Sequence, residues 1–483
     1  MIEAVISGAD MAVVDENAAA LGVPRRQLME SSGNAVAREV RAVADPGDSV
    51  TVVAGRGNNG GDAFVAARFL DDFDLTVLLL GRAATIATDI ARGNWEALRD
   101  AEYDTREVRD STALALGDPD VIVDAMLGTG ISGALREPAA TAAAAIDDSD
   151  ATVVSVDVPS GLDAGTGTLP AGAVHPDRVV TFHKPKPGLA DLDATVTVAD
   201  IGVPAAAERF VERGDLTRLS RPADSHKGAF GEVLVVGGGP YTGAPALAAR
   251  AALRAGADLA RVACPESVAD AIAGYDQNLI VRPFDGERFT PEAVDRVLEL
   301  AADHDSVCLG PGLGESEATR AAVREFLGRF DGTAVVDADA LSVVPDVDTD
   351  ATLLCTPHQG ELRGMGGETA EDYRERGTLV ADFAAELGHT LLVKGRYDVI
   401  SDGRDYRVNR TGNPGMTVGG TGDVLAGTTA ALAATLPVAQ AAAIGAYVVG
   451  AAGDSVADEQ GYGLLATDVP EAVPRVMWGV TDE

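Results

Sequence analysis

A glycine-dense loop near the end of the chain closes on a single carboxylate. Residues 418–423 read VGGTGD, and the Ala- and Leu-rich stretch 424–432 that follows is typical of a helix. Unpaired N–H groups at a helix N-terminus, together with the helix dipole, favour an anion such as a phosphoryl group. Asp423 fits such a site if it takes a proton from a hydroxyl while the loop holds phosphoryl charge. An Asp-capped helix after a glycine turn is the alternative interpretation.

A second glycine-rich loop lies early in the chain. Residues 49–54 form a buried-strand pattern, residues 55–62 read GRGNNGGD, and residues 63–70 are typical of a helix. A strand, a glycine turn and a helix in this order predict a phosphate-cradling unit. The spacing differs from the usual dinucleotide GxGxxG, and the paired Asn58 and Asn59 add polar chemistry that a plain turn would not need.

Further polar side chains follow buried strands in the same part of the chain. Asp124 lies in the strand pattern 120–127, and Asp157 and Ser160 lie toward the end of the pattern 151–163. Ligands of open α/β sheets bind at the carboxyl ends of strands, so these side chains are expected at one edge together with Asn59. Their oxygen atoms suit a group I or II cation, with one carboxylate left for acid–base chemistry. Each residue taken separately also fits a turn or a helix cap.

The composition limits the classes of function. A length of 483 residues favours two or more domains, and 46% hydrophobic residues with 55 glycines in short apolar runs point to an α/β enzyme. The net charge of −37 argues against nucleic-acid binding. No apolar run of about 18 residues and no leader peptide is present, so we expect a cytoplasmic protein that does not bind membranes. The three scattered cysteines predict buried thiols.

The acidic residues are spread along the chain, as on a surface that tolerates self-repulsion in high salt, and we infer a halophilic source. Lysine is nearly absent, because 34 of the 38 basic residues are arginine. The four lysines, which we expect where a compact ammonium is needed, are Lys184, Lys186, Lys227 and Lys394. The segment 183–189, HKPKPGL, predicts either a surface turn or a basic turn that meets ligand phosphates.

The order of the patterns predicts two α/β domains. The polar segment 205–222 is a candidate linker, and the chain restarts after it with a strand at 232–236, a GGG turn and a helix at 246–256. A strand-to-glycine turn follows at 307–314, two acids end the strand pattern 333–341, and a strand at 351–355 leads into TPHQGE.

The motifs GNNGGD, VDAMLGTG and DVPSGLD resemble those of the NAD(P)H-hydrate epimerase domain over residues 1–210. The resemblance implies a Rossmann-like three-layer αβα sandwich, and potassium bound by Asn59, Asp124 and Ser160. It also implies that Asp157 binds substrate and is the catalytic acid–base group. The other implied substrate contacts are Asn58, Asn59, Gly60, Gly61, Asp62, Gly128, Thr129, Gly130, Ile131, Ser132, Gly133 and Ala134. Arg56 and Ala63 depart from the residues usual in that family.

The motifs HKGxxG, YTGAPALAA, GPGLG, DADAL, TPHxGE, KG and GGTGD resemble those of the ADP-dependent NAD(P)H-hydrate dehydratase domain over residues 220–480. The resemblance implies a ribokinase-like αβα fold with Asp423 as the catalytic residue. The implied substrate contacts are Ala244, Gly312, His358 and Asp423, and the implied nucleotide contacts are Lys394, Gly395, Arg396, Tyr397, Asp398 and Gly422. Asp398 stands where that family commonly has Thr.

Together the two resemblances imply a fused enzyme that repairs hydrated nicotinamide cofactors. Its front domain would interconvert the R and S hydrates of NADH and NADPH. Its rear domain would dehydrate the S form with ADP and Mg²⁺, releasing AMP and phosphate. The expected partners are these small molecules and further copies of the chain. The alternative is a ribokinase-like small-molecule kinase whose front domain binds nucleotides without catalysis.

Overall fold

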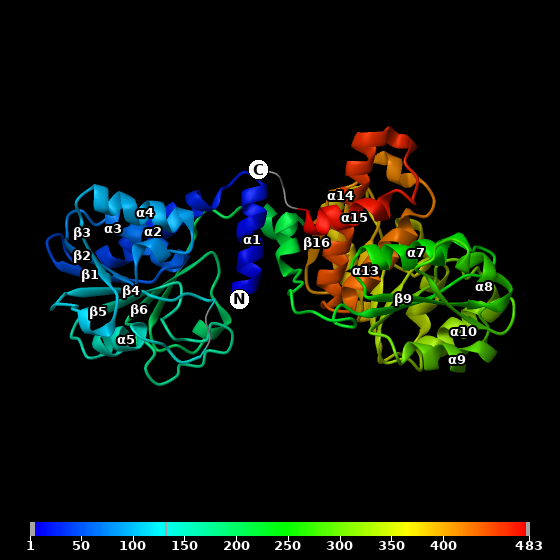
Figure 1. Ribbon diagram of the computed structural model, residues 1–483, viewed down its shortest axis with the longest axis horizontal. Helices are drawn as coiled ribbons and strands as arrows, with labels where there is room; N and C mark the ends of the chain where they lie inside the picture. The colour runs from blue at the N-terminus through cyan, green and yellow to red at the C-terminus, as the bar shows by residue number, and fades with distance from the viewer. Residues whose placement is uncertain (1–4, 131–132, 480–483) are drawn as a thin grey trace. The chain divides into compact units, whose positions relative to one another are not determined.

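The computed structural model describes residues 5–130 and 133–479 (Figure 1). The chain separates into two compact units, one up to Ala207 and the other from Glu208. Ile131 and Ser132, which the sequence assigned to substrate contacts, lie outside the described residues. None of the described helices is long and apolar enough to cross a membrane.

The front unit is built on a seven-stranded sheet in which all neighbouring strands are parallel, in the order β3-β2-β1-β4-β5-β6-β7. From β1 the chain adds strands first on one side of the sheet and then, from β4, on the other. The carboxyl ends of β1 and β4, where this switch occurs, are the expected place for a ligand. The strands are β1 (Ser49–Ala54), β2 (Asp74–Leu80), β3 (Asp104–Val108), β4 (Val121–Ala125), β5 (Thr152–Val156), β6 (Arg178–Phe182) and β7 (Thr195–Ala199).

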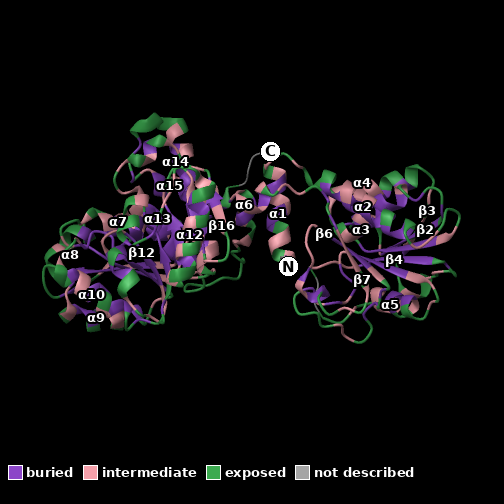
Figure 2. Cartoon of the chain, turned by 180° about the vertical axis from the view of Figure 1, so that it is seen from behind, coloured by how far each residue is buried: buried purple, intermediate pink, exposed green. Residues whose placement is uncertain are grey.

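Helices cover both faces of the front sheet because its strands alternate apolar side chains on either side. One core joins Val50 and Val52 to α2, α3 and α4, and a second joins Val53 and Ile122 to α5 on the other face. Figure 2 shows the central strands as buried. The helices are α1 (Gly8–Ala20), α2 (Arg25–Arg41), α3 (Asn58–Arg68), α4 (Asp89–Asp100), α5 (Ala139–Asp147) and, at the boundary, α6 (Ala206–Arg209).

The rear unit is built on a nine-stranded sheet in the order β10-β9-β8-β11-β12-β13-β14-β15-β16. The strands up to β14 are parallel, and β15 and β16 return antiparallel as hairpins. The strands are β8 (Glu232–Val236), β9 (Leu259–Pro265), β10 (Ile280–Phe284), β11 (Ser306–Leu309), β12 (Thr333–Val336), β13 (Thr352–Cys355), β14 (Thr390–Val393), β15 (Asp398–Ser401) and β16 (Tyr406–Asn409).

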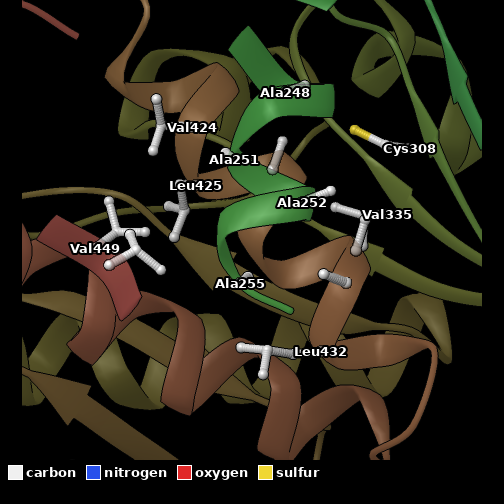
Figure 3. Close-up of a cluster of buried hydrophobic side chains, with 14 of the residues drawn as sticks. Ala248, Ala251, Ala252, Ala255, Cys308, Val335, Val424, Leu425, Leu432 and Val449 are labelled. Carbon is white, nitrogen blue, oxygen red and sulfur yellow. The ribbon is translucent and has the colours of Figure 1, made fainter. Parts of the chain in front are cut away.

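Small residues let the rear helices pack closely on this sheet. One core contains α7, α13, α14 and α15, and the opposite core contains α9, α10 and α12. Figure 3 shows Ala248, Ala251 and Ala252 of α7 among the side chains of the first core. The helices are α7 (Gly243–Arg254), α8 (Glu266–Ala273), α9 (Pro291–Ala301), α10 (Glu317–Leu327), α11 (Gln359–Gly364), α12 (Tyr373–Leu387), α13 (Thr421–Ala433), α14 (Val438–Gln460) and α15 (Val469–Trp478).

The predicted fold class is confirmed, with a Rossmann-like front unit and a ribokinase-like rear unit, both of α/β type. Two helices begin earlier than their sequence patterns indicate. α3 begins at Asn58 and α13 at Thr421, so the polar motif residues lie inside the first turns of these helices. The glycines of both motifs are compatible with a helical first turn. Because the helices begin inside the motifs, the unpaired N–H groups of their first turns belong to motif residues.

Candidate active sites

The front unit contains a cavity of about 1440 Å³ at the carboxyl ends of its central strands. It is bounded by the loops after β1, β4 and β5 and by residues of α1 and α2. The predicted contact residues that line it are Asn58, Asn59, Asp62, Gly128, Thr129, Gly130, Gly133, Ala134 and Asp157. Gly60 instead allows close packing of α3, because a Cβ there would lie 2.2 Å from the carbonyl oxygen of Gly55. Gly61 packs against Met29 in the same way.

Asp124 and Ser160 are fully buried at the end of β4 and after β5. The Ser160 hydroxyl donates to Asp124 Oδ1 at 2.6 Å, and the Ser160 N–H donates to Oδ2 at 2.8 Å. Burial raises the pKa of the Asp124 carboxyl, and the hydrogen bonds from Ser160 and Ser155 oppose the rise. The Ser160 hydroxyl also accepts from the N–H of Leu127 at 3.0 Å.

Asn59 reaches the same backbone segment, because its Nδ2 donates to the Leu127 carbonyl at 3.0 Å. Its Oδ1 is buried, and among the described residues it has no hydrogen-bond partner. A buried acceptor without a hydrogen bond lowers the stability of the fold, so this oxygen is expected to bind a donor or a cation. With Asp124 and Ser160 it forms a set of hard oxygen atoms that fits a cation such as potassium.

Asp157 follows β5 with a left-handed backbone at φ 64°. Its Oδ1 lies 2.7 Å from Nζ of Lys186 and accepts a hydrogen bond from the Thr181 hydroxyl at 3.1 Å. The Lys186 ammonium is 1% exposed and also donates to Thr181 Oγ1 and to the Phe182 carbonyl, at 3.1 and 3.0 Å. The buried ammonium of Lys186 is therefore held against the predicted catalytic carboxylate.

The interpretation of segment 183–189 as a surface turn is wrong for Lys186, which is buried and faces a carboxylate. The alternative, a basic turn that meets ligand phosphates, stays a prediction. The signal that could have found this residue is the scarcity of lysine, since Lys186 is one of only four. Sequence spacing could not show that β6 brings the following turn back beside the end of β5.

Two more carboxyl groups line this cavity. Burial raises the pKa of Asp15 to about 6, while the charges of Arg25 and Lys186 oppose the rise. Burial also raises the pKa of Asp62 well above its usual range, and the nearby charges of Asp157 and Asp15 raise it further. Groups with such shifted pKa values in a cavity are candidates for proton transfer. Asp15 was not identified from the sequence.

In the rear unit, α13 begins directly after Gly420, which has φ 103° and no side chain to cap the helix. The first turn of α13 therefore leaves the N–H groups of Thr421 and Gly422 for a phosphate, and binding of phosphate by residues 419–422 stays a prediction. Asp423 lies in that same first turn. Burial raises the pKa of Asp423 to about 7, with Asp337 raising it further and Lys394 opposing.

Lys394 approaches the same turn, since a Cβ on Gly422 would lie 3.4 Å from its Nζ. Its ammonium donates to Asp337 Oδ1 at 2.8 Å and lies 3.7 Å from Glu361 Oε2. Burial alone would lower the pKa of Lys394, but Asp337 and Glu361 together raise it. Asp337, which the sequence indicated only as an acid at a strand end, thus positions the lysine at the loop.

The remaining predicted rear residues flank this centre. His358 caps α11, because its Nδ1 accepts from the N–H groups of Gly360 and Glu361 at 2.9 and 3.0 Å. Ala244 lies in the first turn of α7. Gly312 has φ 73°, and a Cβ there would lie 2.4 Å from a carbonyl oxygen of the loop before α7, so these two loops touch.

The turn between β14 and β15 contains the predicted nucleotide contacts Gly395, Arg396 and Tyr397, and Asp398 begins β15 directly after it. The Asp398 carboxylate stabilises this turn. It accepts hydrogen bonds from the Gly395 N–H at 2.9 Å and from Asn409 Nδ2 at 3.0 Å. Burial raises the pKa of Asp398 to about 6. The carboxylate that replaces the usual Thr of the resembled family is thus engaged with its own hairpin, while Gly395 and Arg396 stay exposed.

Two family models match the chain. The model for NAD(P)H-hydrate dehydratase matches residues 233–475, and that for the YjeF-related protein N-terminus matches residues 25–188. The chain is 44% identical to the bifunctional NAD(P)H-hydrate repair enzyme Nnr of Methanothermobacter thermautotrophicus, over 97% of this chain and 94% of that protein. It is 45% identical to the Pyrobaculum aerophilum enzyme of the same name, over 98% of each chain.

A solved structure from Streptococcus mutans, the hypothetical protein SMU.573, is similar to the rear unit. It covers 56% of this chain and 98% of its own length, with a TM-score of 0.50 and 26% sequence identity. Both family models match within one chain, and the relatives align over nearly the whole length. The chain belongs to the family of bifunctional NAD(P)H-hydrate repair enzymes.

Proposed function

We propose that this chain repairs hydrated NADH and NADPH with two activities. The front unit interconverts the R and S hydrates, and the rear unit dehydrates the S form with ADP. The observation that carries the proposal is the alignment of nearly the whole chain with proteins named bifunctional NAD(P)H-hydrate repair enzymes, together with the match of residues 233–475 to the NAD(P)H-hydrate dehydratase model. In addition, Asp157 and Asp423 each lie in a site of their own, one in each unit.

In the rear site, Asp423 would take the proton of the ring hydroxyl, whose oxygen then attacks the β-phosphate of ADP. AMP leaves, and the lone pair of the ring nitrogen then expels inorganic phosphate to give a ring iminium ion. Loss of a proton from the neighbouring ring carbon to water forms the C=C bond, returns the C=N pair to nitrogen and restores the reduced ring. The N–H groups at the start of α13 would hold the phosphoryl oxygens during transfer. Donors of this kind contribute roughly 3–4 kcal/mol each in comparable oxyanion sites.

Mg²⁺ fits this site as a partner of the nucleotide. The described residues contain no cluster of three or more His, Cys, Asp or Glu side chains that could hold a metal. Mg²⁺ commonly binds through one or two carboxylates together with substrate phosphates. Asp337 and Glu361, the carboxylates beside Lys394, are the side chains that would hold it, and it would supply charge neutralisation of the phosphates.

In the front site, potassium would be held by Asn59, Asp124 and Ser160. The buried Oδ1 of Asn59, which has no hydrogen-bond partner among the described residues, supports this proposal. Potassium would supply a fixed positive charge beside the cavity. A halophilic source, a cytoplasmic location and assembly with further copies of the chain remain predictions from the sequence.

The products of the reaction distinguish this function from a small-molecule kinase. The full chain is incubated with the S hydrate of NADH, ADP and Mg²⁺, and the mixture is separated by chromatography. Equimolar NADH, AMP and inorganic phosphate are expected. A stable phosphorylated product in place of free phosphate would contradict the proposal and favour the kinase.

A further inference from the structure

Helix α1 places one carboxyl group in the front cavity. The residues of α1 that line the cavity are Gly8, Met11, Ala12 and Asp15. Their spacing of three and four residues is that of a single helix face. Asp15 is the charged residue among them, while Val14 and Ala18 join the hydrophobic core. The carboxyl is therefore carried by an anchored helix and has a fixed direction.

The charged groups that interact with Asp15 come from other elements and are Arg25, Asp62, Asp157, His183 and Lys186. Two of these cations also form ion pairs with other carboxylates. Arg25 lies 2.6 Å from Glu16, and Lys186 lies 2.7 Å from Asp157. Within residues 5–130 and 133–479, no ion pair or hydrogen bond neutralises the Asp15 carboxyl. A partly buried, unneutralised carboxyl lowers stability, so its presence on the cavity face points to a role in the reaction.

We propose, resting on the proposed function, that Asp15 is the second catalytic acid–base group of the epimerisation and works together with Asp157. The two epimers differ at the carbon that carries the hydroxyl group, next to the ring nitrogen. Exchange of one for the other requires the hydroxyl to leave from one face and water to return to the opposite face. Asp15 comes from α1 and Asp157 from the end of β5, which are two different walls of the cavity.

The step balances with these two groups. The Asp15 carboxyl gives its proton to the hydroxyl oxygen, the C–O bond breaks, and water leaves with the electron pair of that bond. The lone pair of the ring nitrogen forms the C=N bond of a cyclic iminium ion. A water oxygen then adds to the other face, the C=N pair returns to nitrogen, and the water proton passes to the Asp157 carboxylate. The reverse reaction exchanges the two roles.

Asp15→Asn in the full chain tests this role. The purified R hydrate of NADH is mixed with enzyme and potassium without ADP, which leaves the rear site silent, and the S form is measured by chromatography after quenching. We expect kcat to fall ~100-fold or more, the range for loss of a general acid–base group, with KM changed by less than about threefold. Asp15→Glu should recover part of kcat, and the limb of the wild-type pH–rate profile near pH 6 should be absent in Asp15→Asn.

Asp10→Asn is the matched control, because it makes the same change on the same helix at a residue that does not line the cavity. It should epimerise at the wild-type rate. Tryptophan emission, which combines the buried Trp95 of the front unit with the exposed Trp478 of the rear unit, reports whether each variant is folded. If wild type fails to epimerise, the proposed front activity is wrong. If wild type is active and folded Asp15→Asn retains its kcat and pH profile, the role of Asp15 is overturned.

Discussion

The two units place the aspartates that we propose as catalytic in opposite electrostatic surroundings. In the front unit Asp157 is 2.7 Å from the buried ammonium of Lys186. In the rear unit the corresponding lysine, Lys394, binds Asp337 at 2.8 Å, and Asp423 has no ion pair among the described residues. The Asp157 carboxylate is neutralised directly by Lys186. Asp423 has only the N-terminus of α13 and Lys394, which is already paired with Asp337.

This difference follows from what each site must hold. The rear site must accept phosphate, so its N–H groups and Lys394 face an anion, and Asp423 can keep a proton near pH 7. The front site has no comparable phosphoryl transfer to support. It can therefore commit its one buried lysine to Asp157 and leave other carboxyls, Asp15 and Asp62, to hold protons.

The largest expected effect is that of Asp423→Asn. Without a base for the ring hydroxyl, dehydration should fall by ~10³-fold or more, within the range of lost acid–base catalysis. The N–H groups of α13 remain, so ADP should bind with nearly unchanged affinity in calorimetry. Epimerisation in the front unit is the internal control and should be unaffected. A variant that dehydrates at nearly the wild-type rate would exclude Asp423 as the base.

The pH dependence of dehydration should follow Asp423. The carboxylate is the active form, so kcat should fall about tenfold per pH unit below the pKa of about 7. Initial rates between pH 5.5 and about 8.5 at constant ionic strength measure this dependence. A flat profile across this window would mean that another group limits the rate.

The same pKa predicts how stability changes with pH. Folding raises the Asp423 pKa from 3.8 to about 7, so the folded chain binds the extra proton between these values. The contribution of the protonated Asp423 to the free energy of unfolding is fully present below pH 3.8 and is lost as the pH rises through 7. Asp423→Asn removes the buried charge and should stabilise the rear unit at pH 8 by roughly 1–2 kcal/mol. Denaturant titrations at pH 5 and 8 measure it, and an equal shift at both pH values would argue against this cause.

Lys186→Ala should destabilise the front unit strongly. Removal of one partner from a buried ion pair leaves Asp157 unpaired and costs about 3–5 kcal/mol. The midpoint of denaturant unfolding, followed through Trp95, measures this loss. Lys227→Ala is the control, because Lys227 is exposed and its removal should change stability by less than about 0.5 kcal/mol. Equal stability of both variants would show that the ion pair contributes little.

Gly420→Ala should have a smaller effect that is confined to the rear unit. A side chain at φ 103° is strained, and its Cβ would lie 2.8 Å from Leu247 Cδ1 and 2.9 Å from Ala466 Cβ. We expect a loss of roughly 1–3 kcal/mol and slower dehydration. Gly419→Ala provides the comparison, because a Cβ there meets nothing within 4 Å. If the two variants are alike, the shape of the loop before α13 is not critical.

Much of this arrangement could be predicted from the sequence. Buried-strand patterns followed by glycine loops identified β1, β4, β5 and the ligand edges, because those signals are local in the chain. β3 was not predicted, since four of the five residues of its sequence DTREV are polar and it forms a sheet edge. Lys186, Asp15 and Asp337 were not assigned to a site. Their roles depend on which distant elements they meet, and no local spacing encodes that.

The central claim is that one chain repairs both epimers. It is tested most directly by incubating the full chain with mixed NADH hydrates, ADP, Mg²⁺ and potassium at high salt, and following the absorbance of reduced nicotinamide. The account predicts recovery of all the hydrate, because the front unit resupplies the S form as the rear unit consumes it. Recovery that stops when the S form is exhausted, under conditions where spontaneous epimerisation is slow, would contradict the proposed front activity.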